Sequence, residues 1–301
     1  MLGWIIFFLF IVAILVLDLA VLHRKAHVIE YKEALLHTAL FVALSLVFNI
    51  GIYLFVGRTE AIEYLTGYLI EYSLSVDNLF VFIIIFRYFD VPSRYKHNTL
   101  IWGILGAFIT RGIFIFAGVS LIQKFHWIIY IFGILLIITA IRMFIEKEKH
   151  MKIERNPVLR LLKKILRVTD HYEKGNFFAR HNKLFYVTPL FIVLMVIETT
   201  DIVFAIDSIP AIFAITMNPF IIYTSNAFAI LGLRSLYFAL EGIIKLFHYL
   251  NYGLSVILAF VGIKMLISSV YQIPTHIALS FIAVVLFISI FVSILYPPKS
   301  E

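Results

Sequence analysis

The sequence consists of long apolar runs separated by shorter polar connections. A helix needs roughly 20 mainly apolar residues to cross the hydrocarbon core of a bilayer. Nine runs come close to this length or exceed it, and they predict an all-α, polytopic membrane protein. The predicted spans are residues 3–22, 34–56, 63–87, 99–122, 127–145, 186–217, 221–241, 252–271 and 276–296.

Lys and Arg are concentrated in alternate connections between these spans. The basic connections are residues 23–32, 94–97 and 146–185, followed by Lys299 after the last span. With nine spans all of them fall on one side, which the positive-inside rule identifies as the cytoplasm. We expect a multi-pass protein of the cell membrane, with its N-terminus outside and its C-terminus inside.

Segment 146–185 is the one sizeable connection, and it divides the chain into membrane halves at residues 1–145 and 186–301. It carries more Lys and Arg than Asp and Glu. We expect a solvated, basic cytoplasmic loop. The alternative is that Arg160–Arg167 form a short amphipathic helix on the membrane surface.

Composition supports the membrane class and narrows the chemistry. The chain is 62% hydrophobic and 14% charged, whereas soluble domains have about 45–50% apolar and about 25% charged residues. The net charge of +7 then reflects membrane orientation, and no nucleic-acid partner is expected. Because the chain has no cysteine, any metal must be held by oxygen or imidazole, which favours Mn²⁺, Mg²⁺ or Ca²⁺. Common enzyme motifs are missing from the sequence, so we expect neither an enzyme nor a permanently bound cofactor.

Acidic side chains occur in two of the predicted spans, within the sequences EYSLSVDN (71–78) and ETTDIVFAIDSIP (198–210). A charged residue at the centre of a membrane helix costs at least ~2.5–3.5 kcal/mol. So many acids in two spans are hard to explain by packing, and they predict a polyvalent cation site near the membrane midplane. The candidate ligands are Glu71, Asp77, Asn78, Glu198, Asp201 and Asp207.

The two acidic stretches begin two similar units. Glu71 and Asp77 are six residues apart, as are Asp201 and Asp207. Three landmarks follow each stretch at nearly equal spacing: Arg111, His126 and Arg142 in the first unit, and Arg234, His248 and Lys264 in the second. Each unit, about 63–145 and 186–271, holds three spans, so the two must be inverted relative to each other. Inverted repeats with a midplane site between them are a known transporter plan.

A straight helix does not direct all these carboxylates at one ion, because residues six apart are separated by about 120°. Pro210 removes a backbone donor and frees the carbonyl of Ile206. We therefore expect the second acidic helix to unwind near Pro210, where freed carbonyls would add cation ligands. The first copy has no proline after Asp77, so a break there would rest on Ser and Asn residues.

The basic residues within the spans allow a second interpretation. Arg111, Arg234 and Lys264 would balance charge or gate the site beside a bound ion, or would neutralise the acids in purely structural ion pairs. Three further side chains are possible accessory ligands, although the two histidines fall at span ends, where they are more often interfacial. These are Asn49, His126 and His248.

At these residues the chain resembles the TerC family of integral membrane proteins, which is named for an association with tellurium resistance. The two acidic stretches carry the resemblance, together with residues 18–34, 233–237 and 262–266. The resemblance covers nearly the whole chain. It implies manganese efflux, as in several bacterial members, and a wider link to metal homeostasis and alkaline pH.

These observations lead to a functional hypothesis: a secondary transporter that exports a divalent cation, with Mn²⁺ as first choice. An empty cluster of buried carboxyls should not be fully ionised, and metal binding should displace its protons. Protons are therefore the expected coupling ion. The alternatives are a membrane scaffold for a tellurite- or metal-stress complex, export of another ion such as Ca²⁺, and an exporter of an anion or small solute in which Arg111, Arg234 and Lys264 face the substrate.

Overall fold

The computed structural model describes residues 2–17, 31–125, 127–145, 164–169, 171–181, 184–241 and 249–295. Nine α-helices make up most of this part of the chain, one for each predicted span. They are α1 (Leu2–Leu17), α2 (Tyr31–Phe55), α3 (Arg58–Tyr88), α4 (Ser93–Lys124), α5 (Ile128–Ile145), α7 (Pro189–Phe213), α8 (Pro219–Glu241), α9 (Leu250–Ile267) and α10 (Thr275–Leu295). The prediction of an all-α, polytopic membrane protein is confirmed.

The helices follow from the apolar runs, because a chain in lipid must satisfy its backbone hydrogen bonds internally. Six helices in the described part of the chain are long and apolar enough to cross a membrane: α2, α3, α4, α5, α7 and α10. Within α1 and α9 the apolar stretch is shorter than in these six. Helix α8 is largely buried within the bundle and carries the polar residues Thr224, Ser225 and Asn226.

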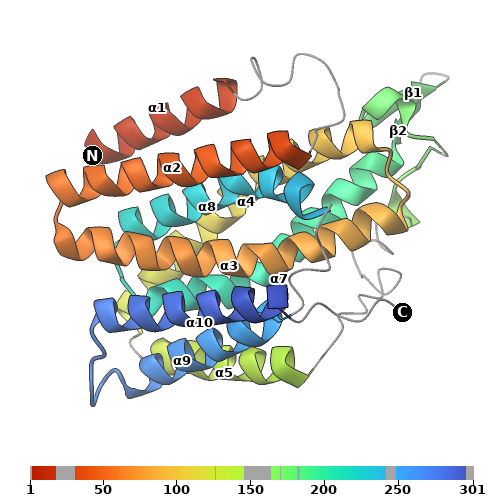
Figure 1. The fold of residues 1–301 in the computed structure, drawn as a ribbon. Helices are drawn as coiled ribbons and strands as arrows, with labels where there is room; N and C mark the ends of the chain where they lie inside the picture. The colour runs from red at the N-terminus through yellow and green to blue at the C-terminus, as the bar shows by residue number, and fades with distance from the viewer. Residues whose placement is uncertain are drawn as a thin grey trace.

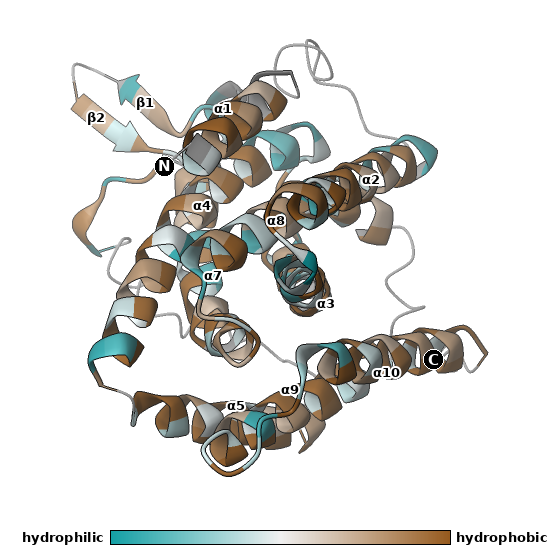
Figure 2. Cartoon of the chain, turned by 90° about the vertical axis from the view of Figure 1, so that its left-hand side faces the viewer, coloured by the Kyte–Doolittle hydropathy of each residue, from teal (hydrophilic) through white to brown (hydrophobic). Residues whose placement is uncertain are grey.

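Successive helices run in alternate directions, so α1 begins and α10 ends at opposite ends of the bundle (Figure 1). Helix α3 lies inside it, packed against α2, α7, α8 and α10 (Figure 2). Helix α4 packs against α7 and α8, and α5 packs along α9. The triplet α3–α4–α5 thus runs opposite to the triplet α7–α8–α9, as inverted units would.

The outer helices present apolar side chains outward, where lipid would cover them. On α10 these side chains are Ile277, Val284, Phe287, Ile288, Ile290, Phe291, Ile294 and Leu295. Helix α3 is different, because most of its apolar stretch is buried within the protein. Its polar residues are therefore shielded from lipid by the surrounding helices.

The prediction that the second acidic helix unwinds near Pro210 is wrong. Helix α7 continues through Pro210 to Phe213, and α3 is also unbroken from Arg58 to Tyr88. Pro210 stands in the last turn of α7, where its missing N–H removes one hydrogen bond close to the helix end. Membrane helices tolerate proline when neighbouring groups re-satisfy the freed carbonyl.

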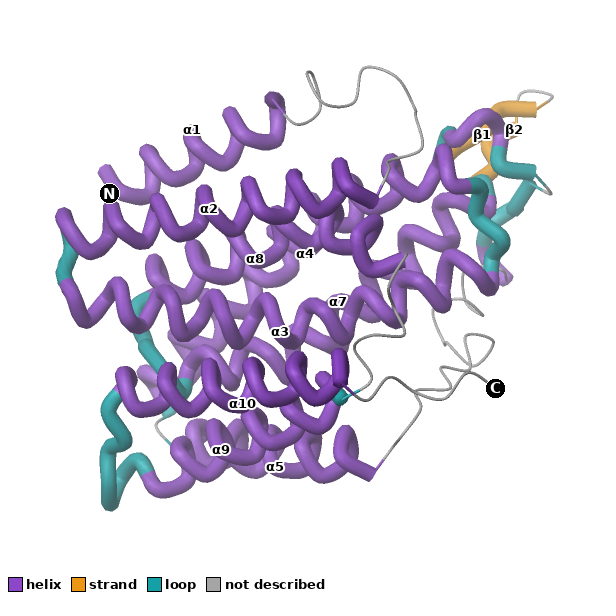
Figure 3. Tube along the Cα trace, in the orientation of Figure 1, coloured by secondary structure: helices purple, strands orange, loops and turns teal. Residues whose placement is uncertain are grey.

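Segment 146–185, which we expect to be a solvated basic loop, contains regular structure that the sequence did not predict. Its final part contains a turn of 3₁₀ helix, η3 (Glu173–Gly175), and a β-hairpin formed by β1 (Phe178–His181) and β2 (Leu184–Val187) (Figure 3). The sixth helix consequently begins at Pro189 and not at residue 186. Most of the alternative surface helix, Arg160–Arg167, lies outside the described residues.

Candidate cation site

Four helices from both halves of the chain meet around the side chain of Arg111. Glu71 comes from α3, Arg111 from α4, Asp201 from α7 and Asn226 from α8. All four side chains are buried, with exposed fractions of 0% for Glu71, 1% for Arg111, 4% for Asp201 and 1% for Asn226. The two acidic helices therefore do lie together, as the sequence pattern suggested.

Arg111 bridges one carboxylate from each acidic stretch. Its Nη1 donates to Oε1 of Glu71. Its Nη2 lies 3.1 Å from Oδ1 of Asp201, and its Nε lies 3.4 Å from Oδ2 of the same carboxylate. Two parallel bonds from a planar guanidinium fix both the position and the orientation of its partner.

Neutral side chains complete the network. The Asn226 amide accepts from Arg111 Nη1 at 2.9 Å and donates to Glu71 Oε2 at 3.0 Å. Ser208 Oγ lies 3.4 Å from Arg111 Nη1, and Ser75 Oγ donates to Glu71 Oε1 at 3.3 Å. The guanidinium is thus surrounded by oxygen atoms, the ligands that hard divalent cations prefer.

Two carboxylates against one guanidinium give this network a formal charge of −1. Bringing such charges out of water is expensive, and it is offset only when geometry is good and the remaining hydrogen bonds are made. The partners of Arg111 meet that condition. The network is accordingly both a structural ion pair and a place where the fold holds positive charge among oxygens.

Glu198 adds a third carboxylate to this region. It lies three residues before Asp201 on α7, slightly less than one helical turn away. Its carboxylate packs directly over Gly106 of α4, where a Cβ atom would overlap it. The glycine therefore provides the room that the Glu198 side chain occupies.

The other predicted ligands are only partly visible. Asp77 and Asp207 lie in unbroken helices, and their side chains fall outside the described part of the structure. Asn78 is 3% exposed, and its Nδ2 has no hydrogen-bond partner among the described residues. Among those residues no three His, Asp or Glu side chains are grouped closely enough to hold a metal.

The remaining basic and accessory residues of the prediction are placed less fully than Glu71, Arg111 and Asp201. Arg234 is buried on α8, two turns beyond Asn226. Asn49 on α2 is half-buried, and its Oδ1 has no hydrogen-bond partner within the described chain. His126 and His248 lie outside the described residues, so the structure gives no information on them.

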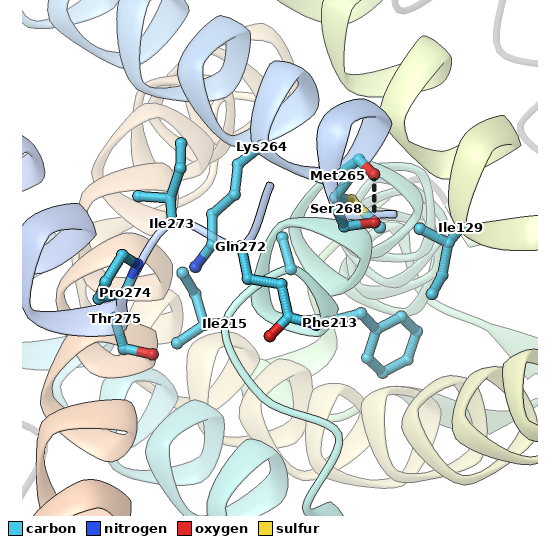
Figure 4. A pocket seen from close by; sticks show the side chains of 11 residues that line it. Ile129, Phe213, Ile215, Lys264, Met265, Ser268, Gln272, Ile273, Pro274 and Thr275 are labelled. Atoms are coloured by element: carbon cyan, nitrogen blue, oxygen red, sulfur yellow. Dashed lines mark hydrogen bonds between the residues drawn. The ribbon is translucent and has the colours of Figure 1, made fainter. Parts of the chain in front are cut away.

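Lys264 lies in a separate cavity of about 400 Å³, near the ends of α7 and α9 and the start of α10. Figure 4 shows its side chain extending into this cavity beside Gln272 and Ile273. Lys264 interacts electrostatically with the carboxylate of Glu63 on α3. Glu63 precedes Glu71 by eight residues, which is about 12 Å along the axis of α3. Lys264 is therefore not part of the network around Arg111.

Sequence reasoning missed Asn226, which contacts both Arg111 and Glu71. A signal was present, because Thr224-Ser225-Asn226 interrupts an otherwise apolar run. Polar side chains in membrane spans usually face the bundle interior. An amide alone, however, did not distinguish a site residue from a residue that pairs helices.

Comparisons with known proteins agree with the fold. A membrane protein of Myxococcus xanthus named "Uncharacterized membrane protein STKORF319" is 47% identical over 301 residues, covering 99% of this chain and 94% of that protein. The "Putative membrane-bound redox modulator Alx" of Salmonella typhi is 45% identical, over 94% of this chain and 91% of that protein. Its counterpart of the same name in Escherichia coli K12 is 46% identical, over 90% and 88%.

No solved structure matches the chain. The family described as "Integral membrane protein TerC family" matches residues 56–301, which include every element of the network around Arg111. The chain therefore belongs to the TerC family and is a multi-pass integral membrane protein.

Proposed function

We propose that the protein is a transporter that exports a divalent cation, with Mn²⁺ as first choice, in exchange for protons. The observation that carries the proposal is that the buried carboxylates of Glu71 and Asp201 both pair with the guanidinium of Arg111. The two acids come from two acidic helices in opposite halves of the chain. A scaffold has no need for such a cluster inside a membrane. Intramembrane acids that face a bundle interior commonly mark ion pathways.

Arg111 supplies the positive charge in this conformation. Its guanidinium lies among oxygens of Glu71, Asp201 and Asn226, which are suitable ligands for Mn²⁺. A metal ion and the guanidinium cannot use the same oxygens together. In the proposed cycle Arg111 withdraws when the metal binds and returns when it leaves, so the carboxylates always have a cation nearby.

Proton exchange follows from the ligand chemistry. Carboxyls must lose their protons before they bind a metal, so loading releases protons and unloading takes them up. The remaining acids, Glu198, Asp77 and Asp207, are the candidates to release these protons as they become ligands of the metal, because Arg111 already pairs with Glu71 and Asp201. An export cycle would then bring protons inward as metal moves outward.

The name of several relatives mentions redox modulation, and the same hypothesis accommodates it. This chain has no cysteine, so it offers no thiol for dithiol exchange. A redox effect of this protein would therefore arise indirectly, through the level of a redox-active metal such as manganese.

Flux measurements in proteoliposomes with a pH-sensitive dye inside test the proposal. We expect Mn²⁺ to move with an opposite movement of protons in the wild type. Glu71→Gln, Asp77→Asn and Asp207→Asn should each abolish flux while the protein still inserts. Asp90→Asn, which changes an exposed carboxylate between α3 and α4, serves as the control and should transport normally.

Each other outcome identifies a different alternative. Mn²⁺ flux without proton movement would rule out exchange, and wild-type flux in all three variants would remove the carboxylate site. Ca²⁺ flux in place of Mn²⁺ flux would identify Ca²⁺ as the substrate and would still support the carboxylate site. No cation flux in the wild type would favour the membrane scaffold.

A further inference from the structure

The β-hairpin of β1 and β2 projects from a bundle of α-helices. It lies at the end of the bundle where α7 begins (Figure 1), and the view along the bundle shows it extending sideways beyond the helices (Figure 2). Such a position places it over the membrane surface beside the protein and not over the central helices.

The hairpin is firmly attached to the helices. Thr188, which joins β2 to α7, donates from its Oγ1 to the carbonyl of Asn176 at 2.7 Å. The Tyr172 hydroxyl donates to the Phe89 carbonyl, in the turn between α3 and α4. The 167–169 segment pairs with Val187 on the free side of β2. The hairpin therefore has a fixed position relative to the bundle.

One face of the hairpin combines aromatic and basic side chains. Residues directly opposite each other in an antiparallel pair lie on the same face, and here the pairs are Arg180 with Phe185 and Phe178 with Val187. Phe178 is 60% exposed and Phe185 is 73% exposed, while Val187 is buried. The Arg180 guanidinium lies 5.3 Å from the centre of the Phe185 ring. Phe178, Arg180 and Phe185 form the hairpin face.

The neighbouring segment adds charge of the same sign. Lys164 and Arg167 are exposed, as is the apolar side chain of Ile165 between them. Residues 164–188 contain five Lys and Arg against two Asp and Glu, a formal charge of +3. An excess of this size beside exposed phenylalanines is complementary to an anionic, partly apolar surface.

Aromatic contacts indicate the depth of the hairpin in the membrane. The Phe177 ring lies 6.3 Å from the ring of Trp102 on α4. Trp102 stands at the boundary between the polar start of α4 (93–98) and its apolar continuation. Helix α4 has 32 residues, about 48 Å, so it is longer than the roughly 30 Å hydrocarbon core. Its polar start therefore reaches the headgroup region, where tryptophan rings concentrate.

We propose that the hairpin face, with Lys164 and Arg167, is a docking surface for anionic lipid headgroups of the adjacent leaflet. The phenylalanine rings enter the interface between headgroups and acyl chains, and the guanidinium groups bind headgroup phosphates. Basic residues next to membrane helices bind anionic lipids in this way, and planar guanidinium groups suit phosphate oxygens. The proposal does not depend on what the protein transports.

Spin labels test the depth of the hairpin face. The chain has no cysteine, so a single cysteine at position 178 or 185 reports from that site alone. In nanodiscs we expect labels there to be more accessible to oxygen than to an aqueous nickel chelate. A label at Val270, exposed in the connection between α9 and α10, should show the reverse. Equal chelate access at positions 185 and 270 would overturn the proposal.

Lipid retention tests the charge requirement. Native mass spectrometry compares retained phosphatidylglycerol and phosphatidylcholine in the wild type and in an Arg167→Gln/Arg180→Gln variant. Apparent affinity for the anionic lipid should fall by about fivefold for each removed charge. The matched control, Arg58→Gln/Lys124→Gln, removes two exposed charges at the opposite end of the bundle and should change retention little.

Two results would refute the anionic-lipid assignment. Equal retention of phosphatidylglycerol in both double variants would show that the hairpin end has no lipid preference. Dipolar coupling between labels at position 185 of two molecules would identify a second copy of the chain as the occupant of this face.

Discussion

At the scale of single residues, Arg111 is the side chain on which the network depends. Removing it leaves the carboxylates of Glu71 and Asp201 buried without the counter-charge that Arg111 supplies. Breaking a buried pair in this way costs about 3–5 kcal/mol. Removing one carboxylate is less harmful, because Arg111 keeps the other. We therefore expect Arg111→Gln to destabilise the protein more than either Glu71→Gln or Asp201→Asn.

Thermal unfolding of the purified protein in detergent measures this order. If Arg111 and the metal compete for the same oxygens, added Mn²⁺ should restore stability to Arg111→Gln more than it stabilises the wild type, because ligand binding to the native state adds stability. The double variant Arg111→Gln/Glu71→Gln, which lacks part of the site, should respond less. An Arg111→Gln variant as stable as the wild type would contradict the buried network.

The sequence predicted the carboxylates of this network better than their partners. Glu71 and Asp201 were identifiable because an ionised acid in an apolar run has a large energetic cost that needs an explanation. The basic residue that pairs with them could not be identified, because Arg111, Arg234 and Lys264 all lie within predicted spans and the sequence does not distinguish them. Their different places depend on helix rotation and depth, which only the packed structure determines.

At the scale of elements, the seam between α5 and α9 depends on two glycines. A Cβ at Gly262 would lie 2.8 Å from the carbonyl oxygen of Gly133, and a Cβ at Gly133 would lie 3.0 Å from the carbonyl oxygen of Gly262. The obstructing atoms belong to the backbone and cannot rotate away. Small residues at helix interfaces permit this close approach in membranes.

We expect Gly262→Ala to force α5 and α9 apart and to destabilise the protein by about 1–3 kcal/mol, the usual cost of overpacking. Gly51→Ala is the matched control, because a Cβ at that position on α2 meets nothing within 4 Å. Alanine there should be neutral or slightly stabilising, since glycine is the weaker helix former. Equal thermal unfolding temperatures for the two variants would argue against the close seam.

The elements themselves were largely predictable, and the two errors have physical causes. Apolar runs fix membrane helices strongly, because lipid leaves the backbone no other satisfied conformation. The prediction at Pro210 failed because the effect of a proline on a helix depends on its distance from the helix end. Helix α7 ends only three residues after Pro210. The hairpin at 178–187 was missed because its strands have only four residues each and are stabilised by contacts with 167–169 and α7.

At the scale of the whole molecule, the arrangement of the helices agrees with two inverted triplets. Helices α3 and α7 meet at Arg111, and α5 and α9 pack together, so corresponding helices of the proposed repeat are neighbours. Spacing of landmarks along the sequence suggested this pairing. The superposition of Glu71 on Asp201, and of Asp77 on Asp207, stays a prediction, as does the position of the termini relative to the cell.

Orientation in the cell can be tested with two exposed positions at opposite ends of the bundle. Ile165 lies at the end that carries the hairpin, and Val270 lies in the connection between α9 and α10. Of the described basic residues in the connections, Arg94, Lys96 and Arg167 lie at the Ile165 end. The positive-inside rule assigns an end rich in Lys and Arg to the cytoplasm. A membrane-impermeant maleimide should therefore label Val270→Cys in intact cells, and Ile165→Cys only after permeabilisation. Because the native chain has no cysteine, either signal comes from the introduced residue alone. Labelling of Ile165→Cys in intact cells would reverse the orientation, and with it the direction in which the proposed proton gradient drives metal.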